Sequence, residues 1–502
     1  MNKIKYAFLG IVAVAFAGCA DLDYNEASNR DEDWTYNSPL NGVKALVYDV
    51  YAQMPSEFKD NSYGNGAMIA SATDESEFAL SFSPIHKYFN GGWTPSNPFS
   101  ITWDRSYRAI TQVHMYLERI HKIDLSDYEY DPDYQTMVQQ FEIFPYELRF
   151  LRAYFYFELV RAYGDVPLVT TTLTNEQANS VERTPAKDVF RFIINELDAV
   201  AEYLPVSYND IPGQEIGRAT RGAALALKAR VLLYQASPLF NTDNSKELWK
   251  EAAAASKVII DNAQRWGYKL SEYANLWGHD TFTNPEFIFV LGTQASNTFE
   301  QYNYPVGVEN GNSGNCPTQA LVDAYEYQFD GKTFKEKHPG DVDVTAENPY
   351  DGLDPRFALT VVKNGDLWPS NTAQQIAIET YQNGFNGAPK YGATPTGYYL
   401  KKFVDGNCIT TANNQTTTRH NWIVMRLAEV YLNYAEAMYN YYGNADEPGD
   451  FGMSANEAVN VLRNRPDIMM PEFQGNNGFE ERYMRERMVE LAFEGQRFWD
   501  VR

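Results

Sequence analysis

The stretch from Ala219 to Ala263 constrains the fold of this chain most, because it predicts two helices rich in small residues. Pro238 ends the first helix, and Asn244 with Glu247 predicts a capping box at the start of the second. The alanines allow close approach, so we expect an antiparallel hairpin of the tetratricopeptide type. Apolar residues recur at the spacing of one helix face in both halves: Leu225, Ala229, Leu232 and Ala236, then Leu248, Ala252, Ala255 and Ile259.

Helical periodicity also appears on both sides of this hairpin, and it fades in two irregular stretches. The first irregular stretch, 56–100, is rich in Gly, Pro, Ser and aromatics, and the second is 265–420. The sequence therefore predicts a mainly α fold, a tetratricopeptide-like scaffold with a large loop-rich portion containing short strands. Helices are expected at 41–54, 103–120, 134–163, 184–204, 423–442, 455–464 and 479–498, and strands at 287–291, 359–362 and 398–403.

The start of the chain has the features of an export signal. Lys3 and Lys5 precede an apolar run, 6–17, that is too short to span a bilayer. The run ends in Ala-Gly before Cys19, which resembles the bacterial lipoprotein signal and implies a lipidated cysteine. Asp21 and Asp23 resemble the acidic signal that sends Bacteroidetes lipoproteins to the cell surface.

These features divide the chain into consecutive parts. We expect a signal peptide at 1–18, a lipidated tether at 19–40 and an N-terminal helical scaffold at 41–264. The loop-rich portion at 265–420 is expected to carry the ligand face, and 421–502 to return to the scaffold. The last helix runs to Arg502 without a cap signal, which is the pattern of a truncated chain.

Charge and cysteine content restrict the function classes. With 66 acidic and 42 basic residues the net charge is -24, so nucleic acid is not expected as a partner. No CxxC pair occurs, which argues against a thiolate metal site. Cys316 and Cys408 are equally compatible with a disulfide and with two free thiols.

Five segments, in chain order, resemble the SusD/RagB family of outer-membrane lipoproteins. The resemblance implies a non-catalytic protein that forms a lid over a SusC-like TonB-dependent transporter. Its ligands would be oligosaccharides, with peptides in the RagB-like branch as the alternative. The segments are 150–169 (FLRAYFYFELVRAYGDVPLV), 222–241 (ending in SPLFN), 399–403 (YLKKF), 421–437 (NWIVMRLAEVYLNYAEA) and 485–500 (RERMVELAFEGQRFWD).

An enzyme should leave a motif, and the sequence contains no HExxH, GxSxG, P-loop or GxGxxG. A surface glycoside hydrolase remains a distant alternative, because two of the many carboxylates could form a dyad. His114 and His121 share a helix face, where packing is the simpler interpretation. No cofactor is expected, although Asp341-x-Asp343-x-Thr345 resembles half of a Ca²⁺ loop.

Sugar binding needs exposed aromatic rings flanked by short polar groups. Three loop segments offer this mixture, and they supply the candidate ligand-binding residues. The expected helices contain Trp249, Trp422 and Trp499, which are interpreted as core residues. The charged residues from Arg485 to Arg497 are interpreted as a solvated, ion-paired face of the last helix. The candidates are Asp74 and Trp93 in 74–93, Tyr302, Tyr304 and Asn310 in 298–315, and Trp368 in 364–369.

Overall fold

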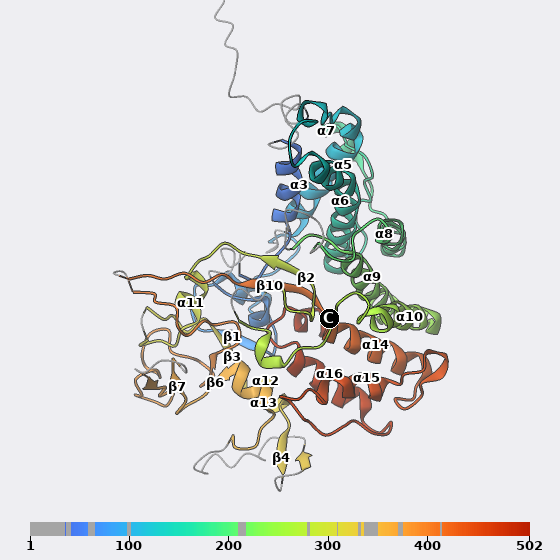
Figure 1. Cartoon of the computed structure of the whole chain (residues 1–502). Helices are drawn as coiled ribbons and strands as arrows, with labels where there is room; N and C mark the ends of the chain where they lie inside the picture. The colour runs from blue at the N-terminus through green and yellow to red at the C-terminus, as the bar shows by residue number, and fades with distance from the viewer. Residues whose placement is uncertain are drawn as a thin grey trace, which may run out of the picture.

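The computed structural model shows a curved band of helices beside a loop-rich portion (Figure 1). It describes residues 36, 42–58, 66–97, 102–208, 217–278, 282–308, 310–329, 333–335, 350–369, 375–411 and 414–502. The predicted signal peptide, the lipidated Cys19 and the Asp341–Asp343 motif lie outside these residues. The prediction of a mainly α fold with a loop-rich portion and short strands is confirmed.

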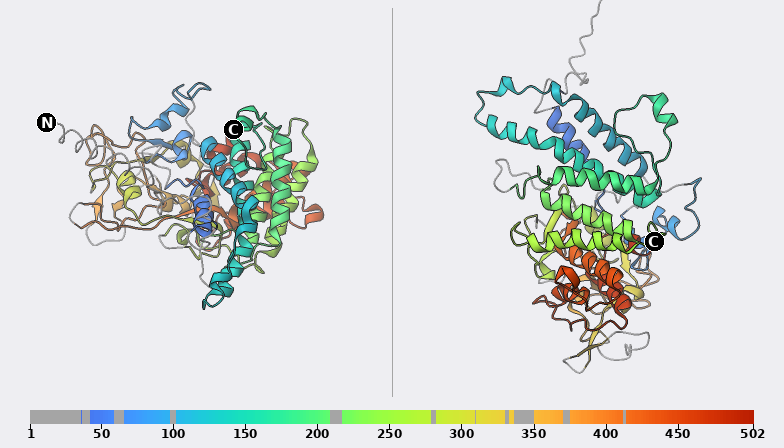
Figure 2. Two further views of the ribbon diagram at one scale, coloured as in Figure 1. Left: turned by 90° about the horizontal axis from the view of Figure 1, so that it is seen from above. Right: turned by 90° about the vertical axis from the view of Figure 1, so that its right-hand side faces the viewer.

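The helical band consists of helices that pack against their neighbours in sequence, and two views show them stacked as nearly antiparallel layers (Figure 2). α10 packs against both α9 and α14, so the hairpin links the two halves of the scaffold across the loop-rich portion. The band contains α3 (Val43–Ala52), α5 (Thr102–Arg119), α6 (Tyr134–Tyr163), α8 (Ala186–Ala201), α9 (Arg221–Ala236), α10 (Lys246–Asn262), α14 (Leu427–Tyr442), α15 (Ala455–Arg463) and α16 (Phe479–Glu490).

The central hairpin forms where the alanine pattern predicts it, and α9 is buried on most sides. Thr220 caps α9, because its side chain accepts a hydrogen bond from the Ala223 N–H. The capping box expected at Asn244 is wrong: Ser245 is the N-cap of α10 and makes no side-chain cap bond. Asn244 instead adopts a left-handed conformation, φ 52°, in the turn.

The loop-rich portion contains short helices and two-stranded antiparallel pairs. The pair β1–β3 ties the irregular stretch 56–100 to this portion, since Glu77 lies opposite Cys316. The short helices of this portion are α11 (Thr298–Asn303), α12 (Gln319–Ala324) and α13 (Pro355–Thr360), whereas α7 (Asn175–Ser180) lies between α6 and α8 in the helical band (Figure 1) and α17 (Arg497–Asp500) follows α16. The pairs are β1 (Ser76–Phe78) with β3 (Asn315–Pro317), β2 (Phe287–Gly292) with β10 (Asn421–Arg426), β4 (Tyr327–Phe329) with β5 (Thr333–Lys335), β6 (Val361–Val362) with β9 (Tyr399–Leu400), and β7 (Leu367–Trp368) with β8 (Ile376–Ala377).

Two predicted helices differ from the structure. The helix expected at 423–442 begins only at Leu427, because residues 421–426 form the buried strand β10. The continuous apolar run of residues 421–426 is compatible with a helix or a strand, and pairing with β2 selects the strand. The helix expected at 479–498 ends at Glu490, and Phe493 at φ 61° and Gly495 at φ 74° redirect the chain before α17.

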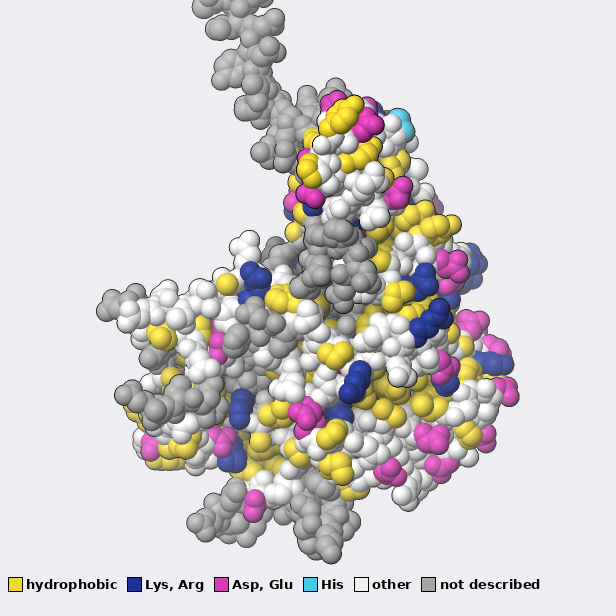
Figure 3. Space-filling model, viewed as in Figure 1, with side chains coloured by type: hydrophobic (Ala, Val, Ile, Leu, Met, Phe, Trp, Pro, Cys, Tyr) yellow, Lys and Arg dark blue, Asp and Glu magenta, His cyan; other side chains and the backbone are white. Residues whose placement is uncertain are grey.

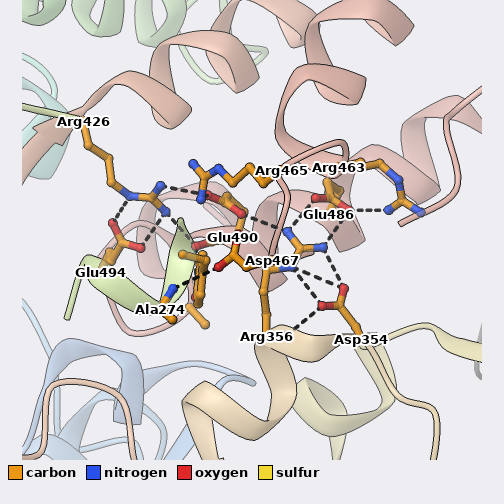
Figure 4. A network of polar contacts seen from close by, with 12 residues as sticks. Ala274, Asp354, Arg356, Arg426, Arg463, Arg465, Asp467, Glu486, Glu490 and Glu494 are labelled. Carbon is orange, nitrogen blue, oxygen red and sulfur yellow. Dashed lines mark hydrogen bonds and ion pairs between the residues drawn. The ribbon is translucent and has the colours of Figure 1, made fainter. Parts of the chain in front are cut away.

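The charges of α16 do not form a solvated face, which corrects the sequence-based interpretation. Glu486, Arg487 and Glu490 are buried, and Glu490 lies at the centre of a network of ion pairs (Figure 4). Its carboxylate accepts hydrogen bonds from Arg426 Nη1 at 2.8 Å and Arg356 Nη1 at 2.9 Å. Burial alone would raise the pKa of Glu490, but the surrounding arginines outweigh it and hold that pKa well below its usual range. The network joins α16 to β10 and to α13, which contains Arg356.

The tryptophans expected in the core divide into two groups. Trp249 and Trp422 are buried, as predicted, although Trp422 lies in β10. Trp499 in α17 is only partly buried, and the Arg161 guanidinium lies 4.0 Å from its ring centroid.

Cys316 and Cys408 are both buried free thiols, and burial raises their pKa values to about 12 and about 11.

Candidate functional site

Exposed aromatic side chains gather in two loops, one in the irregular stretch 56–100 and one in the loop-rich portion. Nine aromatic side chains are exposed among the described residues, and six of them lie in 82–93 and 381–391. Folding normally buries such rings, so their concentration here makes these two loops the candidate site. We call these six the aromatic surface: Phe82, Phe89, Trp93, Tyr381, Phe385 and Tyr391.

The first loop of the aromatic surface is built on a small core of its own. Leu80 and Ile85 are buried against Phe78, and Ser83 caps the short 3₁₀ helix Pro84–Tyr88 by accepting a hydrogen bond from the Ile85 N–H. The rings of Phe82 and Phe89 flank this helix and remain exposed. The loop therefore presents them from a fixed backbone.

Trp93 lies at the end of the same loop and is 39% exposed. Its backbone N–H donates to the Lys87 carbonyl at 3.0 Å, and its ring meets the Tyr88 ring edge-on with 4.7 Å between the ring centroids. The Arg502 guanidinium lies 5.7 Å from the Trp93 ring centroid. One edge of Trp93 is thus fixed by packing while the rest of the ring stays accessible.

The second loop follows β8 and is held by an amide and a carboxylate. Asn386 Nδ2 donates to the Val306 carbonyl at 2.8 Å, and its Oδ1 accepts from the Glu379 N–H at 3.0 Å. The Glu379 carboxylate accepts from the Phe385 N–H at 2.9 Å. Lys390 Nζ lies 4.2 Å from the Phe385 ring centroid, a cation–π contact on the surface.

The two aromatic loops meet at Gly392, beside the loop of 304–314. A Cβ placed on Gly392 would lie 3.4 Å from Leu80 Cδ2 and 3.8 Å from the Asn312 carbonyl oxygen. Asn312 Nδ2 donates to the Gln301 carbonyl, and Asn310 Nδ2 donates to the Thr410 carbonyl at 2.8 Å. The backbone carbonyl of Asn312 therefore lies at the junction of the two loops, and the amides of Asn310 and Asn312 hold the segment that carries it.

The structure separates the predicted site residues. Trp93, Tyr302 and Asn310 lie at or near the surface, with the half-buried Tyr302 ring packed on Gly66. Asp74 forms an ion pair with Arg497 in α17. Tyr302 lies in the last turn of α11 and Tyr304 lies just after this helix, which ends at Asn303.

Tyr304 and Trp368 were expected to be exposed, and this expectation is wrong. They are only 2% and 3% exposed, and their rings meet edge-on at 5.4 Å in a small core beneath the loops. The Tyr304 hydroxyl contacts the carbonyls of Asp405 and Cys408 at 2.6 and 2.7 Å. Both side chains support the loop portion from inside.

Sequence reasoning did not select the loop 381–391. Tyr381, Phe385 and Tyr391 lie in a stretch rich in Gly, Asn and Pro, which is the same signal that selected Trp93. That signal could have identified them. It could not show that this loop touches the loop of 80–93, about 300 residues earlier in the chain.

A cleft of about 210 Å³ lies beside Trp93, between the loop portion and α6. Its carboxylates are already engaged: Glu57 accepts from the Ile69 N–H, Glu158 pairs with Arg161, and Glu494 pairs with Lys402. These contacts favour structural roles over the free acid and base that glycoside hydrolysis needs.

Metal ligands do not converge in the described part of the chain: no group of three or more His, Cys, Asp or Glu residues is placed to hold a metal ion there. No described helix is long and apolar enough to cross a membrane. On the face drawn in Figure 3, basic side chains are scattered among acidic ones, in keeping with the net charge.

Comparison with known families gives two matches that cover most of the chain. Residues 285–502 match the SusD family, and residues 22–233 match a SusD-like family described as starch-binding and associating with the outer membrane. A SusD-like protein of Formosa agariphila is 24% identical over the whole of this chain and 90% of its own length.

Solved structures show the same fold. A SusD-like protein from Bacteroides fragilis is 25% identical with a TM-score of 0.73, over 94% of this chain and 87% of that one. A SusD-like carbohydrate-binding protein from the same species is 24% identical with a TM-score of 0.73, over 94% and 86%. A laminarin-binding SusD-like protein is 22% identical with a TM-score of 0.60, over 94% and 91%.

Proposed function

This chain belongs to the SusD/RagB family, and we propose that it is a non-catalytic protein that captures oligosaccharides through its aromatic surface. The concentration of exposed rings in two touching loops carries the proposal. The carbohydrate-binding and laminarin-binding relatives support the ligand class.

The chemistry of the surface suits a glycan. A sugar ring presents a C–H face that stacks on an aromatic ring, and its hydroxyl groups need donors and acceptors at the rim. Phe82 and Tyr391 offer exposed rings, and the backbone carbonyl of Asn312 lies where their loops meet. An open surface without an enclosing wall gives weak binding at a single site, because much of the ligand stays in water.

The capture step is proposed to feed a membrane transporter. The family description of outer-membrane association supports a location at that membrane. We propose that Cys19 is lipidated, that residues 19–40 act as a tether, and that the helical scaffold and the loop portion together form a lid over a SusC-like TonB-dependent transporter. Lipid anchoring of this kind holds a protein at the membrane by burial of acyl chains, at about 0.8 kcal/mol per methylene.

The proposal is tested with soluble protein that lacks residues 1–19. Titration against neutral oligosaccharides of several linkages and against a matched set of peptides measures the ligand class directly. Binding to one or more glycans supports the proposal. Binding to peptides alone would contradict it and identify a RagB-like lid, and release of reducing ends from a bound glycan would reveal a hydrolase.

A further inference from the structure

A second cavity lies away from the aromatic surface, at the junction of the helical scaffold and the loop portion. Its volume is about 880 Å³, within the range of about 300–1,000 Å³ that is typical of small-ligand sites. One wall comes from α3 and the residues before α9, and the other from the end of β2, the start of α11 and His420. We call it the junction cavity.

The base of the junction cavity is held rigidly on the scaffold side. Arg218 Nε donates to Glu147 Oε2 at 3.0 Å, and the Tyr51 hydroxyl donates to the same oxygen at 2.5 Å. The Ala219 N–H in turn donates to the Tyr51 hydroxyl at 2.9 Å. The side chain of Tyr51 is therefore fixed by partners on both α6 and the start of α9.

Hydrogen bonds and ring packing also hold the wall of the junction cavity on the side of the loop portion. His420 Nε2 lies 2.8 Å from Glu300 Oε1, and the Thr293 hydroxyl donates to the His420 carbonyl at 2.9 Å. The Phe58 ring packs against Phe299 at 4.9 Å and against His420 at 4.9 Å between ring centroids. Aromatic faces thus line a pocket whose shape is set by hydrogen bonds.

The lining defines the chemical class of the ligand. Arg218 and His420, the basic side chains among the described lining, each lie against a buried carboxylate, Glu147 and Glu300, and are therefore already engaged within the protein. Thr293, Gln294 and Thr298 place hydroxyl and amide groups near Tyr48 and Phe58. A hydroxyl that donates one hydrogen bond keeps two lone pairs as acceptors.

From this combination of aromatic faces, hydroxyl groups and paired charges, we propose that the junction cavity is a second binding site, for one end of a neutral saccharide. This site is separate from the aromatic surface, because none of the six rings of that surface lines it. A sugar inserted here touches both the scaffold and the loop portion. It therefore stabilises their arrangement, because a ligand that binds only the folded state adds its binding free energy to stability.

The test fills the cavity without disturbing its walls. Ala52 is an exposed lining residue at the end of α3, so Ala52→Trp places an indole at the cavity while leaving the core unchanged. Ala199→Trp is the matched control, since Ala199 is an exposed alanine in α8 that does not line the cavity. Both variants are made in a Phe82→Ser/Tyr391→Ser background, in which the aromatic surface is weakened.

The probes are neutral hexasaccharides of glucose with α-1,4, β-1,3 or β-1,4 linkages, measured by calorimetric titration up to millimolar concentration. We expect one probe to bind the background protein, and Ala52→Trp to weaken it at least tenfold while Ala199→Trp changes it less than twofold. An unchanged affinity in Ala52→Trp overturns the proposal, as does binding of neutral peptides in place of sugars.

Failure of this site and failure of the aromatic surface give different results. If the wild type binds a hexasaccharide but the background protein binds none, the junction cavity is not a saccharide site and the surface proposal stands. If the background protein binds as tightly as the wild type and Ala52→Trp removes binding, the cavity is the site and the surface proposal fails.

Discussion

Arg497 donates two hydrogen bonds to Asp74, from Nε at 2.8 Å and from Nη2 at 2.6 Å. This bidentate pair joins α17 to the segment that leads into the first aromatic loop, across more than 420 residues of sequence. The hydrogen bonds from Arg497 lower the pKa of Asp74. Asp74 was predicted from the sequence as a ligand-binding residue, and the structure shows it holding the loop in place.

Asp74→Asn should lower the free energy of unfolding by less than about 1 kcal/mol at pH 7, because the pair is partly exposed. A carboxyl whose pKa is lower in the folded state stabilises above its unfolded pKa, about 3.9, and loses that contribution as pH falls. The difference between wild type and variant in urea unfolding should therefore shrink below pH 4. Loss of glycan binding in this variant, with stability unchanged, would restore Asp74 as a ligand residue.

Glu490→Gln should cost about 3–5 kcal/mol of stability, because it leaves buried arginines without their carboxylate. Glu481→Gln on the same helix is the control. Its pair with Arg485 is exposed, at 3.3 Å, and should contribute less than about 0.5 kcal/mol. Denaturant unfolding of both variants measures the contrast, and equal small losses would mean that the buried network contributes little.

Glu75 gives the free energy of unfolding a pH dependence opposite in sign to that of Asp74. Burial raises its pKa to about 8, although its carboxylate accepts a hydrogen bond from the Phe493 N–H at 3.0 Å. The folded state therefore holds a proton that the unfolded state releases near pH 4.3, so this group destabilises the fold as pH rises toward 8.

The change Glu75→Gln removes that titration. The stability of wild type relative to Glu75→Gln should decline from pH 5 to pH 8 and level off above it, as measured by unfolding across this range. Glu77→Gln, at an exposed position of β1, is the control for removing a carboxylate from this strand. A constant difference for Glu75→Gln would show that its carboxyl is not protonated in the fold.

Trp93 and Trp368 should respond to truncation in opposite ways. Trp368→Ala should cost about 3–5 kcal/mol, because it opens a hole in the core beneath the loops. Trp93→Ala should change stability by less than about 1 kcal/mol, because the ring is partly exposed, but should weaken glycan binding severalfold. Unfolding curves and glycan titrations on both proteins make the comparison; a stable Trp368→Ala protein that has lost only glycan binding would contradict this assignment.

The sequence predicted the helices from local patterns, and it failed where distant segments decide the outcome. The run 421–426 is apolar enough for a helix or a strand, and only the presence of β2 beside it selects the strand. The acidic residues of α16 have the spacing of a solvated face, yet their partners Arg356 and Arg426 lie 64 to 134 residues away.

The candidate site shows the same limit. Trp93, Tyr304 and Trp368 all lie in turn-rich loops with similar composition, and sequence alone cannot tell which ring faces water. Tyr304 and Trp368 are buried because they pack on each other across 64 residues, a contact that no periodic pattern encodes. The loop of 381–391 was missed although its composition resembles that of the loop chosen.

The central claim is tested most directly by the affinity of Phe82→Ser/Tyr391→Ser for a glycan that the wild type binds. Both rings are exposed, with Tyr391 at 75%, so the variant should fold normally. The control is Tyr130→Ser/Tyr203→Ser, which removes two exposed rings outside the two loops, at 95% and 61%. We predict at least about a tenfold loss of affinity in the first variant and none in the control. Wild-type affinity in the first variant would show that the aromatic surface does not bind the glycan.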